Sequence, residues 1–413
     1  MNNTILIVND NAAIAARVRA IANKLGFESI HVASYFQLEK VLSVETHFFC
    51  ACVDFSLPDA KSGEAIDFLI SQNIPSFVLT NQLADTTRDA VLSKAVVDYI
   101  AAETIHSFDY IAKLLLRLKH NRDIRILIVD DALSARNYLK KLLLRHNFKV
   151  SEASDGAEAL ALLENQPDIK MVVTDQTMPN MTGIELVQKI RMQYSLEQLA
   201  IIAISATPKS IIAARFLKNG ANDCLSKPFN PDEFYARIFC NLEYIEHVAE
   251  VQFAANHDYL TRLFNRRYFF ERAGEITQHD NISNSALAII DLDHFKQIND
   301  QYGHDAGDSV LRQTAQRLES HFRGNLVARF GGEEFCILLQ QMSPDEALGR
   351  LEFFIHHLEH FEMEIPNNSI SITASVGFTV CQSNELEKLI KQADIALYQA
   401  KNNGRNQVVE FKG

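Results

Sequence analysis

The sequence predicts two doubly wound α/β domains followed by one α+β domain. An internal repeat predicts the first part, because residues 4–10 match residues 125–131 and Asp54–Pro58 matches Asp175–Pro179. Both matches have the same offset along the chain, so a whole domain recurs. The pair Gly331-Gly332 lies between two apolar runs, which predicts a β-hairpin in the last third.

Within the repeat, short β-branched runs alternate with helical patterns. In the second copy we expect strands at Ile126–Val129, Met171–Thr174 and Ala200–Ser205, and helices at Ala135–Leu144 and Gly156–Glu164. Such alternation predicts βαβ units around a parallel sheet. In a doubly wound sheet, functional groups lie at the C-terminal ends of the strands.

Two helices mark the domain joints. The first copy is expected to close with the helix Tyr110–His120, and residues 121–123 form a short charged joint. A second helix is expected over Pro231–Asn256, because no Gly or Pro interrupts it after its start. Its apolar stripe outlasts the second domain, which favours a dimerising stalk over a plain spacer. The stripe consists of Phe234, Ile238, Leu242, Ile245 and Val248.

We place the domain boundaries at 1–121, 122–246 and 247–413, with a linker helix at the start of the third domain. In that domain an antiparallel-containing sheet with helices on one face is expected. The expected elements are a strand at Ala286–Leu292, helices at His294–Asn299 and Asp308–Phe322, a hairpin at Leu326–Leu339, a strand at Ile370–Thr379 and a helix at Leu386–Lys401.

Composition limits the classes of function. The chain has 413 residues and a formal net charge of −12, which argues against binding nucleic acid through a basic surface. Its six cysteines form no CxxC pair, so we expect reduced thiols and no zinc site built from them. We find no leader-like segment at the start and no apolar run of the ~20 residues that span a bilayer. We therefore expect a cytoplasmic protein that binds neither membrane nor nucleic acid.

Polar residues gather at the predicted strand ends of the second copy. Asp130, Asp131 and Asp175 are expected to meet at one crevice and bind a divalent cation. One carboxylate can then attack a phosphoryl donor. Ser205 is placed to hydrogen-bond the new phosphoryl group, and Lys227 is placed to pair with it.

This constellation resembles the flavodoxin-like receiver domain of two-component response regulators. The resemblance implies that Asp175 is phosphorylated by a cognate histidine kinase or phosphotransfer protein, with Mg²⁺ or Mn²⁺ bound. Cys224 stands where the family often has an aromatic switch residue. That difference concerns how a conformational change is relayed and leaves the chemistry intact.

The first copy departs from the receiver pattern. Asp54 and Thr80 remain, but Asn9 replaces an acid and Ala102 stands where the family has lysine. We therefore expect a degenerate receiver that serves as an adaptor or dimer face. Phosphorylation of Asp54 stays an alternative, because the nucleophile itself is present.

The last third carries acids at two further strand ends. Asp291–Lys296 follows one apolar run, and Arg329–Phe335 contains the hairpin turn. Two such strand ends can converge on one metal ion, the usual way to bind a nucleoside triphosphate. Three further blocks accompany them: Asp258–Arg267, Gly303–Asp308 and Ala400–Asn406.

These blocks resemble the GGDEF family of diguanylate cyclases, which has a palm-like α+β fold. The resemblance implies that two GTP molecules condense to cyclic di-GMP and two pyrophosphates. It also implies that Asp291, the carbonyl of Leu292 and Glu333 hold Mg²⁺ or Mn²⁺. Glu333 is the candidate general base, and Lys296 would stabilise developing phosphate charge.

The resemblance also assigns substrate contacts. Asn299 and Asp308 would read the guanine edge, because a carboxylate accepts from groups that adenine does not offer. His304 would lie near the base or ribose. Lys401 and Arg405, four residues apart at a helix end, would both face the terminal phosphates.

Four other positions complete the assignment. Asp293 is expected to be a structural hydrogen-bonding residue, and Glu334 ranks behind Glu333 as a metal ligand. Many family members carry Arg-x-x-Asp before the Gly-Gly pair, which binds product and inhibits. Here Phe322 and Asn325 occupy its two ends, so we expect weak product inhibition.

The resulting hypothesis is a response regulator whose output is a diguanylate cyclase controlled by Asp175 and by homodimerisation. One rival is a binding module that holds GTP or cyclic di-GMP without turnover. A second rival is a transcription factor. It is disfavoured by the net negative charge of the chain and by the lack of a helix-turn-helix pattern after the receivers.

Overall fold

The computed structural model describes residues 3–412 except 45–46, 81–90, 92–93, 103–104, 207–209, 280–283, 367 and 382–384. The chain forms two compact units, Met1–Val248 and Ala249–Gly413. Over the described residues, no helix has the length and apolar character needed to cross a membrane.

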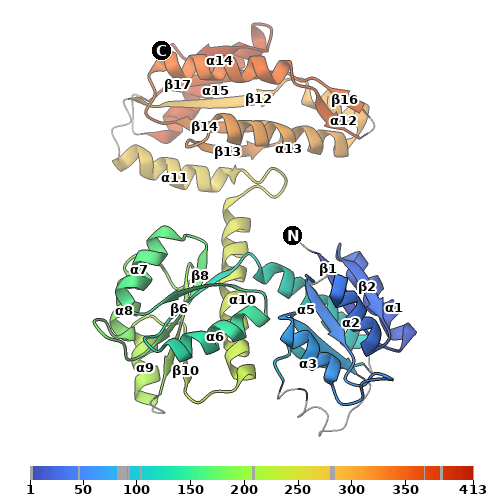
Figure 1. The fold of residues 1–413 in the computed structure, drawn as a ribbon. Helices are drawn as coiled ribbons and strands as arrows, with labels where there is room; N and C mark the ends of the chain where they lie inside the picture. Colours follow the sequence, from blue (N-terminus) through green and yellow to red (C-terminus); the bar gives the residue numbers. More distant parts are fainter. Residues whose placement is uncertain are drawn as a thin grey trace. The chain divides into compact units, whose positions relative to one another are not determined.

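The first unit contains two five-stranded parallel sheets of the same topology (Figure 1). The first sheet has the order β2-β1-β3-β4-β5 and the second has the order β10-β9-β8-β6-β7, which is the same order read from the opposite edge. The first sheet consists of β1 Thr4–Val8, β2 Glu28–Val32, β3 Cys50–Val53, β4 Ser76–Thr80 and β5 Asp98–Ala101, with helices α1 Ala12–Lys24, α2 Tyr35–Val44, α3 Glu64–Ser71 and α5 Ile105–Asn121.

The second sheet repeats this plan, as the sequence repeat predicts. Its strands are β6 Arg125–Val129, β7 Lys149–Ala153, β8 Ile169–Asp175, β9 Ala200–Ser205 and β10 Asp223–Ser226. Its helices are α6 Leu133–Arg145, α7 Gly156–Asn165, α8 Gly183–Arg191, α9 Ser210–Lys218 and α10 Pro231–Asn256. The expected strands and helices are confirmed to within a few residues at each end.

Both sheets bury side chains on both faces, which makes them doubly wound. Along β1, Ile5 and Ile7 belong to one apolar cluster while Leu6 and Val8 belong to another. Successive side chains of a strand point to opposite faces, so this division requires helices on both sides.

Helix α10 has the bounds that the sequence predicts, but its apolar stripe has a different role. Phe234, Ile238, Leu242 and Ile245 are buried in the core of the second sheet. These apolar side chains are therefore buried within their own domain and are not available as a dimer interface. The exposed face of the helix carries other residues, with Tyr244 49% and Val251 68% exposed.

The second unit is built on a six-stranded mixed sheet of order β11-β13-β14-β12-β17-β18. These strands are β11 Phe264–Asn265, β12 Ala286–Leu292, β13 Leu326–Gly331, β14 Glu334–Leu339, β17 Ala374–Val380 and β18 Val408–Glu410; β15 Met363–Ile365 pairs separately with β16 Asn368–Ile370. The helices are α11 Arg266–His279, α12 Phe295–Tyr302, α13 His304–His321, α14 Pro344–Glu359 and α15 Leu386–Asn402.

Helices cover both faces of this sheet, so the expectation of a single covered face is wrong. All seven residues of β12 are buried. Ala288 and Ile290 pack into a cluster with α13 and α14, whereas Leu287 and Ile289 pack with α11 and α15. A strand that opens with five consecutive apolar residues, without alternation, is the pattern expected when both faces of a sheet are covered.

Candidate phosphorylation and nucleotide sites

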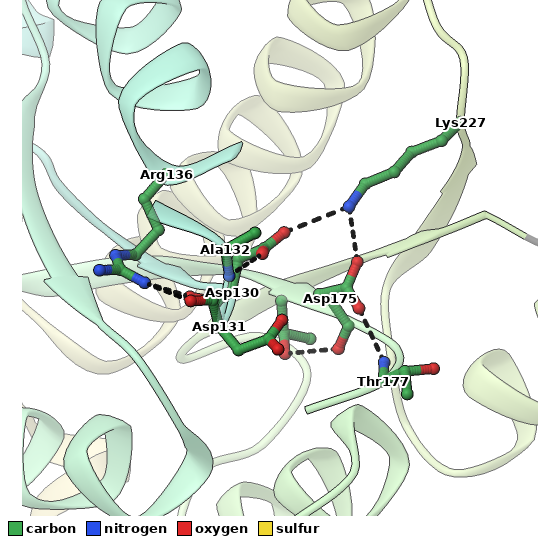
Figure 2. Close-up of polar contacts among 8 residues, drawn as sticks. Asp130, Asp131, Ala132, Arg136, Asp175, Thr177 and Lys227 are labelled. Carbon is green, nitrogen blue, oxygen red and sulfur yellow. Dashed lines mark hydrogen bonds and ion pairs between the residues drawn. The ribbon is translucent and has the colours of Figure 1, made fainter. Parts of the chain in front are cut away.

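The C-terminal ends of β6, β8 and β10 bring an acid pair and a lysine together (Figure 2). Lys227 Nζ lies 2.6 Å from Asp175 Oδ1 and 3.2 Å from Asp130 Oδ2. Burial opposes the charge on Lys227, but Asp175 and Asp130 outweigh it, and the pKa of Lys227 lies above its ordinary value. The lysine thus supplies the positive charge that two adjacent carboxylates require.

Backbone groups hold both carboxylates in place. Asp175 Oδ2 accepts from the Thr177 amide at 2.7 Å, and Asp130 Oδ1 accepts from the Ala132 amide at 2.9 Å. Arg136 donates to the carbonyl oxygens of Asp130 and Asp131 at 2.7 and 3.1 Å. The side chain of Asp131 extends from an exposed position beside this pair (Figure 2).

Two neighbouring residues restrict the loop around Asp175. Ser205, 1% exposed, donates a short hydrogen bond to the side-chain oxygen of Gln176. Gly183, which begins α8, lies against the carbonyl oxygen of Asp175, and a Cβ there would overlap that atom. The oxygen-rich set of Asp130, Asp131 and Asp175 fits a hard cation such as Mg²⁺.

The corresponding edge of the first sheet has asparagine and alanine at the positions of Asp130 and Lys227. Asn9 follows β1 as Asp130 follows β6, and its amide donates to Asp54 Oδ2 at 3.1 Å. Ala102 donates to Thr80 O at 2.9 Å, as Lys227 donates its backbone amide to Ser205 O at 2.7 Å. The two edges thus share this backbone hydrogen bond. The first has the alanine methyl group at the position where the second has the lysine side chain.

The second unit has an acid–lysine pair at the end of β12. Lys401 Nζ on α15 lies 2.7 Å from Asp291 Oδ2. Asp291 pairs across the strands with Glu334, and the Leu292 amide donates to Glu333 O at 3.4 Å. Both glutamates thus lie beside Asp291. Glu334, which sequence reasoning ranked second, is the one directly opposite it.

Burial and mutual repulsion raise the pKa values of these acids. For Asp291, burial raises the pKa more than Lys401 lowers it, and Glu333 adds to the rise. For Glu334, burial and then Asp291 raise the pKa. Clustered carboxylates that resist ionisation are stabilised by a divalent cation, so the donor set fits Mg²⁺.

A pH dependence follows from this crowding. A raised pKa means that these carboxyls take up protons at a higher pH than ordinary acids, and protonated carboxyls are poor metal ligands. We expect the Mg²⁺ concentration for half-maximal GTP turnover to rise as pH is lowered from neutrality toward the range in which these carboxyls take up protons. Turnover measured over a Mg²⁺ series at each pH checks this. A requirement independent of pH would contradict it.

Asp293 has a structural place, as the sequence suggests. It is 5% exposed and accepts from Thr373 Oγ1 and Ser375 Oγ, each at 2.7 Å. The Asn406 amide is a third donor, at 3.1 Å. This carboxylate therefore joins the end of β12 to β17 and to the segment that follows α15.

Arg329 holds the hairpin turn, a role that sequence reasoning missed. Its Nε and Nη2 donate to Gly332 O at 3.0 and 2.7 Å, and its Nη1 lies 2.9 Å from Asp258 Oδ1. Thr261 donates to the same Asp258 oxygen through its amide and hydroxyl. Burial opposes ionisation of Asp258, but these bonds outweigh it and lower its pKa.

The residues assigned to the guanine lie on α12 and α13. Asn299 is half-buried, and Gly307 lies so close to its side chain that a Cβ there would overlap Asn299 Oδ1. Asp308 is half-buried, while His304 and Lys296 are exposed. The contact between Asn299 and Gly307 fixes α12 against α13.

The placement of Arg405 differs from expectation. Helix α15 ends at Asn402, and Arg405 follows it with a left-handed backbone, φ 64°. The helical spacing assumed for Lys401 and Arg405 is therefore wrong, because Gly404 and its neighbours turn the chain out of the helix. Arg405 remains exposed, whereas Lys401 is half-buried against Asp291.

Phe322 and Asn325 occupy the two ends of the inhibitory motif and both make structural contacts. Phe322 is fully buried in the core beneath the sheet. Asn325 donates to Phe322 O at 3.2 Å and accepts from the Gln340 amide at 3.0 Å. Neither residue offers a charged group to an incoming phosphate.

Comparison with known proteins agrees with this organisation. Residues 126–239 match the family described as response regulator receiver domain, and residues 255–407 match diguanylate cyclase, GGDEF domain. A crystal structure of a putative two-component response regulator/GGDEF domain protein is 39% identical; the match covers 59% of this chain and all of that one, with a TM-score of 0.51. The chain belongs to the response regulators that carry a GGDEF domain.

Two curated relatives extend the comparison. The response regulator PleD of Caulobacter vibrioides is 30% identical over 300 residues, which are 69% of this chain and 65% of PleD. The chain thus spans slightly under two thirds of PleD. Diguanylate cyclase DgcM of Escherichia coli is 40% identical over 168 residues, 39% of each chain. The residues before 126 lie outside both family matches.

Proposed function

We propose that this response regulator is a diguanylate cyclase that condenses two GTP molecules into cyclic di-GMP and two pyrophosphates. The observation that carries the proposal is the buried Asp291, paired with Lys401 and flanked by Glu333 and Glu334, in a GGDEF domain. Carboxylates of this kind would hold the divalent cation that offsets the charge of a triphosphate, and they keep acids beside the reacting phosphorus.

The chemistry divides among named side chains. In each of two reciprocal steps, the 3′-hydroxyl oxygen of one GTP forms a bond to the α-phosphorus of the other, and the bond from that phosphorus to the leaving pyrophosphate breaks. Glu333 accepts the hydroxyl proton, and Lys296 offsets charge on the phosphates. Bound at Asp291, the Leu292 carbonyl and Glu333, Mg²⁺ or Mn²⁺ would supply Lewis acidity. When GTP binds, the ammonium group of Lys401 leaves its ion pair with Asp291 and pairs with a phosphate. Arg405 also contacts the phosphates.

Guanine selection rests on Asn299 and Asp308, with His304 nearby. Replacing Gly307 with alanine is expected to displace Asn299, because the new methyl group overlaps its side-chain oxygen. We expect KM for GTP to rise at least about tenfold with a smaller change in kcat, the loss of one good hydrogen bond. Steady-state kinetics check this, with Gly349→Ala on the open surface of α14 as the control. An unchanged KM would contradict the assignment.

The three proposed domains are 1–121, 122–246 and 247–413. We assign the first as a degenerate receiver that acts as an adaptor, because Asn9 and Ala102 remove one acid and the lysine from its strand edge. We assign Asp175 as the residue phosphorylated by a histidine kinase or phosphotransfer protein, with Ser205 and Lys227 holding the phosphoryl group.

Labelling with a small phosphoryl donor distinguishes the two sheets. We expect Asp175→Asn to abolish labelling with base-labile acyl phosphate. We expect Asp54→Asn to leave the labelling unchanged. The reason is that Asp54 lacks a lysine partner at the position of Ala102. Intact-mass spectrometry of both variants after treatment with acetyl phosphate provides the measurement. Equal labelling of wild type and Asp175→Asn would overturn the assignment.

A homodimer is required by the reaction, since each GGDEF domain supplies one half of a two-GTP site. The exposed face of α10 supports this proposal. Its residues follow the 4-3-4-3 spacing of a coiled-coil seam. They are Cys240, Tyr244, His247, Val251 and Ala254, all exposed.

The decisive experiment incubates the pure protein with GTP and Mg²⁺, with and without beryllofluoride, and identifies the nucleotide product. We expect cyclic di-GMP, with faster turnover and more dimer when beryllofluoride occupies Asp175. The rival binding module predicts nucleotide retention without pyrophosphate. Comparison with Glu333→Ala separates the two, because only an enzyme loses pyrophosphate release on that change.

A further inference from the structure

The last turn of α14 carries three potential metal ligands outside both acidic sites. His356, Glu359 and His360 each offer one ligand atom, and these atoms lie within 4.8 Å of one another. Among the residues that the structure describes, this is the one such group of three. Both histidines are exposed and Glu359 is half-buried, so an ion can reach the group from solvent.

Helical spacing brings the three side chains to one face. Residues three and four apart on a helix are neighbours, and the two imidazole centroids are 4.5 Å apart. The opposite face of α14 packs into the core and fixes the helix. Its buried residues are Ala347, Leu351, Phe354, Ile355 and Leu358.

A backbone hydrogen bond orients one of the rings. His360 Nδ1 lies 2.8 Å from the carbonyl oxygen of His356, so this nitrogen carries the proton and donates. With the proton on Nδ1, the lone pair of Nε2 is the one available to a metal ion. Metal-binding histidines usually donate their second ring nitrogen to a carbonyl or carboxylate in this way.

The position on the helix also favours a cation. Helix α14 ends at Glu359, and His360 is its C-cap. The C-terminal end of a helix carries partial negative charge, which stabilises positive charge within the last turn.

We propose that His356, Glu359 and His360 bind a divalent transition-metal ion, with Zn²⁺, Co²⁺ and Ni²⁺ as suitable ions. Two imidazole nitrogens and one carboxylate oxygen suit these borderline ions, whereas Mg²⁺ prefers oxygen ligands. Water completes the coordination. The site is independent of the GTP and phosphorylation sites, so the ion binds with or without cyclase activity.

Metal titration of the full-length, tag-free protein tests the proposal. Millimolar Mg²⁺ is kept present to occupy the carboxylate sites, and Zn²⁺ binding is measured by calorimetry. The absorption bands of Co²⁺ report histidine coordination independently. We expect His356→Ala and His360→Ala each to weaken binding at least about tenfold, since even the partners of metal ligands contribute that much.

The adjacent histidine provides a matched control. The ring of His357 lies 4.1 Å from that of Phe353, and the residue is not part of the ligand group. We expect His357→Ala to bind Zn²⁺ like the wild type. Zn²⁺ should also raise the melting temperature of wild type and His357→Ala but not of His360→Ala. Identical isotherms for all four proteins, or an equal loss in His357→Ala, would overturn the proposal.

Discussion

Asp291→Asn is expected to lower pyrophosphate release from GTP by at least about a thousandfold, which corresponds to several kcal/mol of lost transition-state stabilisation. The variant keeps the shape of the side chain but removes the negative charge beside Lys401 and the two glutamates. It should fold, because burial already disfavours the charge of Asp291 and Lys401 is partly open to solvent. Coupled pyrophosphate assays and thermal melts measure the two effects separately.

Asp293→Asn is the matched control, two residues along the chain. Its carboxylate accepts from Thr373, Ser375 and the Asn406 amide, and an amide can satisfy fewer of these donors. We expect a loss of about 1–3 kcal/mol in the free energy of unfolding, with a much smaller loss of activity per folded molecule. If Asp291→Asn retained turnover within tenfold of wild type, the enzymatic assignment of this site would be wrong.

Asp291 and Asp293 show which features of the site can be predicted from the sequence alone. Strand β12 has the predicted bounds, because a run of five apolar residues, Ala286–Ile290, leads directly to Asp291 and Leu292. The structural role of Asp293 was also expected. The position of Glu334 opposite Asp291 was not, since it depends on the register of β12 against β14, which is set by the whole hairpin.

Other features depend on contacts between distant segments. Arg329 links the neighbouring turn at Gly332 to Asp258, which lies 71 residues earlier and is not recognisable as a partner from the residues around Arg329. Helix α13 begins at His304 instead of Asp308, because Gly303, with φ 85°, lets the chain enter the helix earlier. The second covered face of the sheet did have a sequence signal, since the first five residues of β12 are apolar without alternation.

Gly377→Ala is expected to reduce the free energy of unfolding of the second unit by at least about 3 kcal/mol. Gly377 lies on β17 beneath α15, where a Cβ would overlap the backbone of Ala393 and Leu397. Backbone atoms cannot rotate away as a flexible side chain does, so the helix must shift as a body. We expect the melting temperature of this unit to fall by roughly 6–12 °C.

The same shift should reach the nucleotide site. Helix α15 also carries Lys401, whose ammonium lies 2.7 Å from Asp291, so moving the helix separates this pair. We therefore expect Gly377→Ala to lose turnover even at temperatures where it remains folded. Gly349→Ala on α14 meets no atom within 4 Å and should instead stabilise the unit slightly, by about 0.5–1 kcal/mol. Equal melting temperatures and rates for the two variants would show that α15 does not depend on the close approach at Gly377.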